Sequence, residues 1–86
     1  MSRRRTLKTI QEADYVTIGE LARITGQRYS TLKYYTESGL LPFEQAEENL
    51  TRRYPRESSV QQLHIIAKLK AEGRTIAEIQ EELGPK

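Results

Sequence analysis

Apolar residues recur at intervals of three and four along the segment that begins at Thr17, which is the spacing of one face of an α-helix. Thr17 and Glu20 form a Ser/Thr-x-x-Glu capping box, in which each side chain can satisfy a free amide of the first turn. Gly26 supplies the positive φ that ends such a helix. The pattern predicts a short helix and a tight turn, with these residues on the inner face of the helix: Ile18, Leu21, Ala22 and Thr25.

A second helix is predicted from Tyr29 to Glu37, where Leu32 and Tyr35 fall on one inward stripe. The side chains left outside that stripe are Arg28, Tyr29, Ser30, Lys33, Tyr34 and Glu37. Such an outer face suits phosphates and base edges. Together with the small Ala22 where the two helices cross, this is the packing signature of a helix-turn-helix. Any helical hairpin shares the pattern, so the pattern alone leaves DNA binding open.

A basic hairpin is predicted after the second helix, which ends before Pro42 because the residue preceding a proline is pushed out of the α region. The stretch Phe43 to Tyr54 has room for two short strands and a turn near Glu48-Asn49. Arg52 and Arg53 on the return limb can bond to phosphate oxygens beside a groove. The alternative is a solvated hairpin whose arginines pair with glutamates of the outgoing limb, namely Glu44, Glu47 and Glu48.

The C-terminal third predicts two further helices that close the core under the first pair. Pro55 and the serines at 58 and 59 mark the start of one helix, Gly73 ends it, and Thr75-Ile76-Ala77-Glu78 is a second capping box. The inward faces comprise Val60, Leu63, Ile66, Ala67 and Leu69 or Lys70, then Ile76, Ile79 and Leu83, before Gly84-Pro85 stops the chain. Ile65 fits this stripe least and is the first candidate for a self-association surface.

Charge is unevenly spread along the chain. Its 86 residues have a formal net charge of +2. Residues 1–8 nevertheless hold four basic side chains and no acid, whereas glutamates gather toward the C-terminal end; the basic residues are Arg3, Arg4, Arg5 and Lys8. This asymmetry predicts salt-sensitive binding with the N-terminal side toward a polyanion. We assign residues 1–14 to a basic arm that follows DNA or is a disordered, solvated tail, and residues 15–84 to one folded domain.

The sequence lacks the residues that several kinds of metal, redox and catalytic site require. The chain has no cysteine, so a thiolate metal or redox site is excluded. We expect that its single histidine, His64, lacks the partners for an imidazole cluster or a Ser-His-Asp arrangement. No Gly-rich phosphate loop occurs, and the glutamates of the hairpin do not form a paired-acid site. We expect no enzyme activity, no catalytic or metal-binding residue and no cofactor.

No apolar run is long enough for a membrane span, and Arg3-Arg4-Arg5 is followed by polar sequence instead of the apolar core of a signal peptide. We therefore expect a cytoplasmic, nucleoid-associated protein without a membrane partner.

Linked motifs resemble the DNA-binding domain of the MerR family. They cover Tyr15 to Gly26, Thr31 to Tyr35, Ser38 to Pro42 and Arg52-Arg53-Tyr54, and they continue through residues 68–73 and 76–79. The resemblance implies a mainly α fold with a small β-hairpin, a winged helix-turn-helix of four helices plus a wing. It also implies that the second helix enters the major groove and that the wing contacts the backbone or the neighbouring minor groove.

The candidate DNA-binding residues follow from the outer helix face, the basic segments and this resemblance. They are Thr17, Arg28, Tyr29, Ser30, Lys33, Tyr34, Arg52, Arg53, Tyr54, Arg3, Arg4 and Arg5. By resemblance, Lys33 and Tyr34 occupy positions that family members use on DNA. Tyr54 matches the aromatic residue that closes the family's wing, where it serves either packing or contact.

The sequence also departs from the family pattern. Arg28-Tyr29 stands where the family often has serine and proline, which removes a good N-cap from the second helix. In the wing, Leu50 follows Asn49 where a glycine is usual, and three glutamates precede the turn. Negative charge beside phosphates is unfavourable, so these glutamates bear on how deeply the wing engages DNA.

These features predict sequence-specific binding of double-stranded DNA by a small transcriptional regulator that resembles short, BldC-type members without a ligand-sensing domain. Such a protein would self-associate or bind cooperatively side by side on DNA, with RNA polymerase or a recombinase as a further partner. One alternative is an excisionase, a recombination directionality factor or the DNA-binding module of a recombination system. Another is a protein-interaction module that has lost DNA binding.

Overall fold

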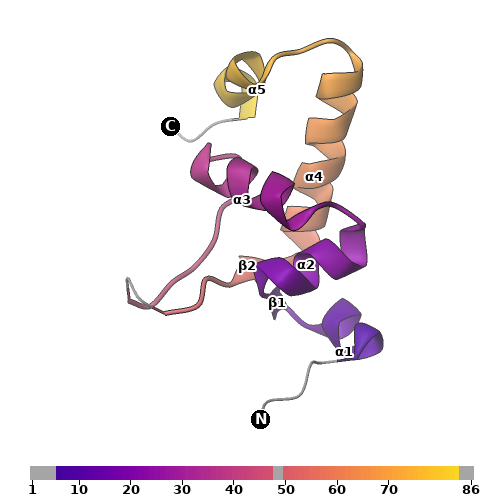
Figure 1. Cartoon of the computed structure of the whole chain (residues 1–86), viewed down its shortest axis with the longest axis vertical. Coiled ribbons are helices and arrows are strands. Elements are labelled where there is room, and N and C mark those ends of the chain that lie inside the picture. The colour runs from indigo at the N-terminus through magenta and orange to yellow at the C-terminus, as the bar shows by residue number, and fades with distance from the viewer. Residues whose placement is uncertain (1–5, 48–49, 84–86) are drawn as a thin grey trace.

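Helices dominate the structure, as the periodicity predicts. The computed structural model describes residues 6–47 and 50–83, and Figure 1 shows how their elements are arranged. In chain order, these elements are α1 (Leu7–Glu12), β1 (Tyr15–Val16), α2 (Ile18–Thr25), α3 (Tyr29–Glu37), β2 (Tyr54–Pro55), α4 (Arg56–Ala71) and α5 (Ile76–Leu83). The expected fold class, a mainly α winged helix-turn-helix, is confirmed.

The helix-turn-helix is built from α2, a short turn and α3. Thr17 accepts a hydrogen bond from the Glu20 amide, and Glu20 accepts one from the Thr17 amide, so the predicted capping box is present. Gly26 ends α2 in the left-handed conformation with φ of 74°. Arg28 is the N-cap of α3 and makes no side-chain capping bond, which confirms the expected loss of a cap there.

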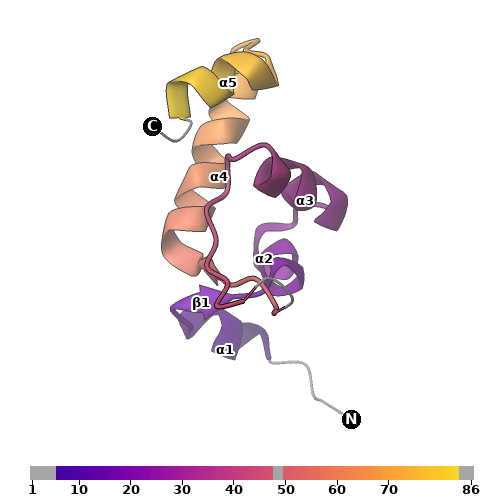
Figure 2. The same ribbon diagram turned by 90° about the vertical axis from the view of Figure 1, so that its left-hand side faces the viewer.

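The end of α3 is tied down by a second left-handed glycine and by buried leucines. Gly39 has φ of 80°, which lets the Leu40 amide bond back to the Tyr35 carbonyl at 2.9 Å. Leu40 and Leu41 then enter the core, where both are buried. From this anchor the chain runs back toward β1, as Figure 2 shows.

The sheet differs from the expected hairpin. β1 pairs antiparallel with β2, in the register Tyr15 with Pro55 and Val16 with Tyr54. Within the described part of the wing, the outgoing and return limbs share one β-bridge, between Glu44 and Arg53. Tyr54 takes its strand partner from upstream of α2 because the return limb leads directly into the paired strand β2. The predicted turn at residues 48 and 49 lies outside the described residues.

Helices α4 and α5 close the core as predicted. Leu63, Ile66 and Leu69 of α4 and Ile79 of α5 are buried, whereas Ala67 is exposed and does not belong to the inward face. Helix α4 begins at Arg56, directly after Pro55 and before the serines expected to mark its start. The second capping box is present between Thr75 and Glu78. The expected stop at Gly84-Pro85 lies outside the described residues.

Helix α1 was not predicted, because its range fell within the expected basic arm. Thr6 caps it by accepting a hydrogen bond from the Thr9 amide. Ile10 is 0% exposed and belongs to the main hydrophobic cluster. Arg56 fixes the following turn by donating from its side chain to the Ala13 carbonyl at 2.7 Å. Helix α1 is therefore packed onto the folded domain through Ile10, the one side chain of the helix that is buried.

The hydrophobic core draws on all these elements. Its buried members are Ile10, Val16, Leu21, Leu32, Tyr35, Leu40, Leu41, Tyr54, Leu63, Ile66, Leu69 and Ile79. Ile65 remains 42% exposed on α4, consistent with its poor fit to the predicted stripe. Among the described helices, none combines the length and apolar character that crossing a membrane requires.

Candidate nucleic-acid interface

Helix α3 separates a buried face from an exposed one. Leu32 and Tyr35 point into the core, as expected, and Thr36 joins them there. Tyr29 is 55% exposed and Tyr34 is 51% exposed. The rest of the predicted outer face, Arg28, Ser30, Lys33 and Glu37, is exposed as well. The structure therefore leaves one flank of α3 uncovered by the described parts of the chain.

The exposed face of α3 is held in place from behind by α4 and α5. Gln80 of α5 donates its side-chain amide to the Ser38 carbonyl at 2.8 Å. Gln62 of α4 donates to the Leu40 carbonyl at 3.0 Å. The Lys70 ammonium lies 3.5 Å from the Tyr35 hydroxyl. Carbonyls at the end of a helix lack partners within the helix, and the bond from Gln80 satisfies the one at the C-cap Ser38. The contacts from Gln62 and Lys70 link α4 to Leu40 just beyond the helix and to Tyr35 within it.

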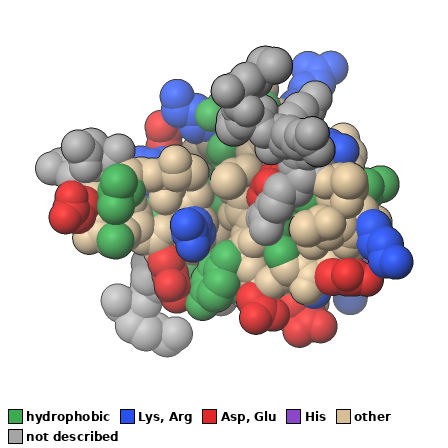
Figure 3. Space-filling model, turned by 90° about the horizontal axis from the view of Figure 1, so that it is seen from below, with side chains coloured by type: hydrophobic (Ala, Val, Ile, Leu, Met, Phe, Trp, Pro, Cys, Tyr) green, Lys and Arg blue, Asp and Glu red, His purple; other side chains and the backbone are tan. Residues whose placement is uncertain are grey.

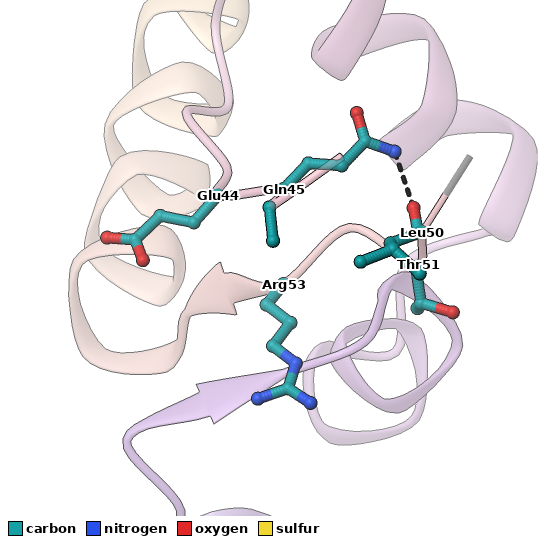
Figure 4. Close-up of a pocket in the computed structure, with 6 residues that line it drawn as sticks. Glu44, Gln45, Leu50, Thr51 and Arg53 are labelled. Atoms are coloured by element: carbon teal, nitrogen blue, oxygen red, sulfur yellow. Dashed lines mark hydrogen bonds between the residues drawn. The ribbon is translucent and has the colours of Figure 1, made fainter. Parts of the chain in front are cut away.

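The two wing arginines point to different sides, although they are adjacent in sequence. The Arg52 guanidinium carbon lies 4.6 Å from the centre of the Phe43 ring. Arg53 lines a hollow with Tyr15, Val16, Thr17 and Glu20, and Figure 4 shows its side chain extending toward β1. Successive residues of a strand face opposite ways, so the wing presents one cation on each of its faces. Both arginines are exposed.

Tyr54 does not belong to the exposed set. It is 0% exposed, and its hydroxyl lies 2.9 Å from that of Thr36, on the buried side of α3. The sequence left packing and DNA contact open for this residue. The structure corrects its inclusion among the DNA-binding candidates, because a fully buried phenol cannot reach a duplex.

Thr17 has a structural task of its own. Its hydroxyl caps α2, and the residue is half-buried. It nevertheless lies at the same hollow as Arg53, so the start of α2 and the return limb of the wing come together. The remaining candidates, Arg3, Arg4 and Arg5, lie outside the described residues.

A hydrogen bond joins the base of the wing to β1. The Tyr15 hydroxyl donates to the Glu44 carboxylate at 3.1 Å. This bond and the nearby negative charge of Glu44 raise the pKa of Tyr15 above its ordinary value of 10.0. The Glu44 carboxylate is thus engaged by Tyr15, and no ion pair joins it to Arg52 or Arg53 in the part of the wing that the structure describes.

An open hollow of about 580 Å³ lies between the two limbs of the wing. The Gln45 amide donates to the Leu50 carbonyl across it (Figure 4). The residues that line this hollow are Glu44, Gln45, Ala46, Leu50, Thr51 and Arg53.

Acidic, basic and hydrophobic side chains are interspersed on the surface at the end of the molecule that holds α1 (Figure 3). In residues 6–47 and 50–83, no group of histidine, aspartate and glutamate side chains is arranged to hold a metal ion.

Comparison with known proteins supports the same fold. The profile of the MerR helix-turn-helix family of regulatory proteins matches residues 16–84. The chain belongs to the MerR family. The resemblance predicted from its motifs is therefore confirmed, and the MerR match includes α2 to α5 but not α1. The family consists of transcriptional regulators and is not a family of enzymes.

One curated relative of this MerR-family chain is the mercuric resistance operon regulatory protein of Bacillus cereus. The two are 37% identical over 67 residues, which represent 78% of this chain and 50% of the relative. The chain thus spans about half the length of this MerR relative. No solved structure matches the chain.

The sequence interpretation missed two residues that position the candidate interface. Thr36 was not placed on the inward stripe, although it follows Leu32 by one helical turn. Phe43 was treated only as the start of the hairpin. The sequence signal for its packing was the presence of an aromatic residue on each limb, Phe43 and Tyr54, since two such residues pack well against each other across a hairpin.

Proposed function

We propose that this MerR-family protein binds double-stranded DNA sequence-specifically through the exposed face of α3 and acts as a transcriptional regulator. The observation that carries the proposal is the division of α3, whose Leu32 and Tyr35 are buried while Lys33 and Tyr34 are exposed. A helix presented in this way fits the major groove, where each base pair displays a distinct pattern of hydrogen-bonding groups.

The side chains on this face have distinct tasks in the proposal. Lys33 and Arg28 supply cations for base edges or phosphates, and the hydroxyls of Ser30, Tyr29 and Tyr34 bond to phosphate oxygens. Arg52 and Arg53 contact the backbone beside the groove from the two faces of the wing. The support for these tasks is exposure and charge in one region of the fold.

Replacing Lys33 tests the proposal directly. Binding sites are first selected from random duplexes, and Kd is then measured by fluorescence anisotropy over a range of salt concentrations. We expect Lys33→Ala to weaken binding by about 1–3 kcal/mol if Lys33 reads a base. If it contacts phosphate instead, the salt dependence should flatten by about one unit. Lys68→Ala removes the same charge from the exposed surface of α4 and is the matched control.

The outcomes test the docking face and separate sequence-specific DNA binding from an interaction module that has lost it. Full affinity of Lys33→Ala would reject α3 as the docking face. No binding of the unsubstituted protein to any duplex at low salt would favour an interaction module. Selection of unrelated sequences with equal affinity would reject sequence-specific binding, since base contacts and not phosphate contacts carry specificity.

A further inference from the structure

The alternation of side chains along the wing places Phe43, Arg52 and Tyr54 together. Glu44 and Arg53 exchange both backbone hydrogen bonds, at 2.7 and 2.8 Å, and so stand directly opposite each other. The next pair along the two limbs is Phe43 and Tyr54, whose ring centres are 6.1 Å apart with an angle of 48° between the planes. This is a favourable tilted arrangement of two aromatic rings.

Arg52 lies two residues before Tyr54 and therefore shares its face of the strand. Its guanidinium carbon is 4.6 Å from the centre of the Phe43 ring, well within the range of an attractive cation–π interaction. An aromatic face attracts the cation electrostatically and does not serve as a conventional hydrogen-bond acceptor. The N–H groups of Arg52 thus remain available to bond bidentately with the oxygens of a phosphate.

The Phe43 ring, over which Arg52 lies, is linked to α3 through Tyr54. Tyr54, on which Phe43 packs, is fully buried and shares a hydrogen bond with Thr36 of α3. Thr36 lies on the opposite side of α3 from the exposed face. A continuous series of contacts therefore runs from the buried side of α3 to Arg52, through Tyr54 and Phe43.

From this geometry we propose that Phe43 is a positioning residue for DNA binding, which holds the Arg52 guanidinium in a fixed place relative to α3. The proposal rests on the proposed function. A long arginine side chain loses rotamer freedom when it binds, and a side chain ordered beforehand loses less. Arg52 is then the pre-ordered backbone contact of the wing, and its partner is a phosphate of the strand beside the groove that α3 enters.

Arg53 provides a matched comparison within the same segment. It is also exposed and lies one residue further along, but it extends to the other face of the wing, toward β1. It has the same charge and the same length as Arg52. A residue that acts by holding Arg52 should therefore show energetic coupling to Arg52 and none to Arg53.

The test is a pair of double-mutant cycles on DNA binding. Phe43→Leu keeps an apolar side chain against Tyr54 but removes the aromatic face, whereas Phe43→Tyr keeps that face. We expect Phe43→Leu to weaken binding about two- to fivefold, the range of an exposed cation–π contact, and Phe43→Tyr to bind as the unsubstituted protein. In the Arg52→Ala background Phe43→Leu should have no further effect, but in the Arg53→Ala background its full effect should persist.

A measurement without DNA checks the positioning itself. In NMR spectra of the free protein, protons of the Arg52 side chain should show the upfield shift of a group above an aromatic ring, and Phe43→Leu should remove it. Thermal unfolding of each variant shows whether the fold is retained. If Phe43→Leu unfolds, the ring-induced shift of Arg52 in the unsubstituted protein still tests the positioning.

The results distinguish this inference from the proposed function. The positioning role is overturned if Phe43→Leu weakens binding equally with and without Arg52, or if it binds as tightly as the unsubstituted protein. It is also overturned if Arg52 shows no ring-induced shift in the free protein. These outcomes leave α3 as the docking face if Lys33→Ala still weakens binding. Failure of the unsubstituted protein to bind DNA would instead overturn the proposed function, and the positioning role with it.

Discussion

The hydroxyl groups of Thr36 and Tyr54 lie 2.9 Å apart inside the core and join α3 to β2. Thr36 also lies 2.8 Å from the Leu32 carbonyl, to which it donates its hydroxyl proton. Because that proton is used, Tyr54 must be the donor of the bond between the two hydroxyls. Helix α3 and the return strand of the wing are thus connected by a buried hydrogen bond with a defined donor.

Because Tyr54 is the donor and Thr36 the acceptor, two conservative substitutions should lower the stability of the protein by different amounts. Tyr54→Phe removes the donor and leaves Thr36 bonded to Leu32, so it should lower the free energy of unfolding by about 0.5–1.5 kcal/mol. Thr36→Val removes the acceptor and leaves a buried hydroxyl unsatisfied, so it should cost about 1–3 kcal/mol. Urea denaturation of both variants measures the difference. A larger loss for Tyr54→Phe would contradict the assigned direction.

The glutamines behind α3 should stabilise it independently. Gln80 and Gln62 bond to different carbonyls, those of Ser38 and Leu40. We expect each change to alanine to lower stability by about 0.5–1.5 kcal/mol, and the double variant to show roughly the sum. Gln61→Ala, at an exposed position of α4, is the control and should change stability by less than about 0.5 kcal/mol. Equal effects of Gln61 and Gln80 would show that the carbonyl bond contributes nothing.

Helix α1 should contribute to the stability of the whole domain. Ile10 is fully buried, so Ile10→Ala should lower the free energy of unfolding by about 2–5 kcal/mol. Leu7 is 45% exposed in the same helix, and Leu7→Ala should cost much less. Thermal and urea unfolding compare the two. If both variants are as stable as the unsubstituted protein, α1 is not part of the cooperative unit.

The bond between Tyr15 and Glu44 predicts an effect at alkaline pH. Folding raises the pKa of Tyr15 above 10.0, chiefly because the neutral hydroxyl donates to the Glu44 carboxylate. A group with a raised pKa in the folded state stabilises the fold below its unfolded pKa, and this contribution is lost as pH rises through the folded value. The stabilisation should therefore be complete below pH 10.0 and decline above it.

Glu44→Gln removes the negative charge and should return the pKa of Tyr15 toward 10.0. Phenolate absorbance during alkaline titration measures this, and subtraction of the Tyr15→Phe spectrum isolates the contribution of Tyr15. An unchanged titration in Glu44→Gln would show that the charge of the Glu44 carboxylate does not act on Tyr15 in solution.

Local chemistry determined how much of the fold the sequence could predict. The capping boxes at Thr17 and Thr75, and the left-handed Gly26, involve residues within one turn of each other. Their patterns can therefore be recognised from the sequence. The exposed face of α3 followed in the same way, because Leu32 and Tyr35 recur at helical spacing. These local signals, in their linear order, also identified the family.

Only the tertiary structure decided which side chains of the wing and the N-terminus are buried. Tyr54 is bonded to a residue 18 positions away, and Arg56 to a carbonyl 43 positions away, and neither partner leaves a periodic signal in the sequence. The opposite directions of Arg52 and Arg53 depend on the register of the Glu44–Arg53 bridge, since a shift by one residue would exchange their faces. Helical periodicity involves residues close together in the sequence and can therefore be recognised from it. The burial of Ile10 and Tyr54 depends instead on which distant elements pack against them.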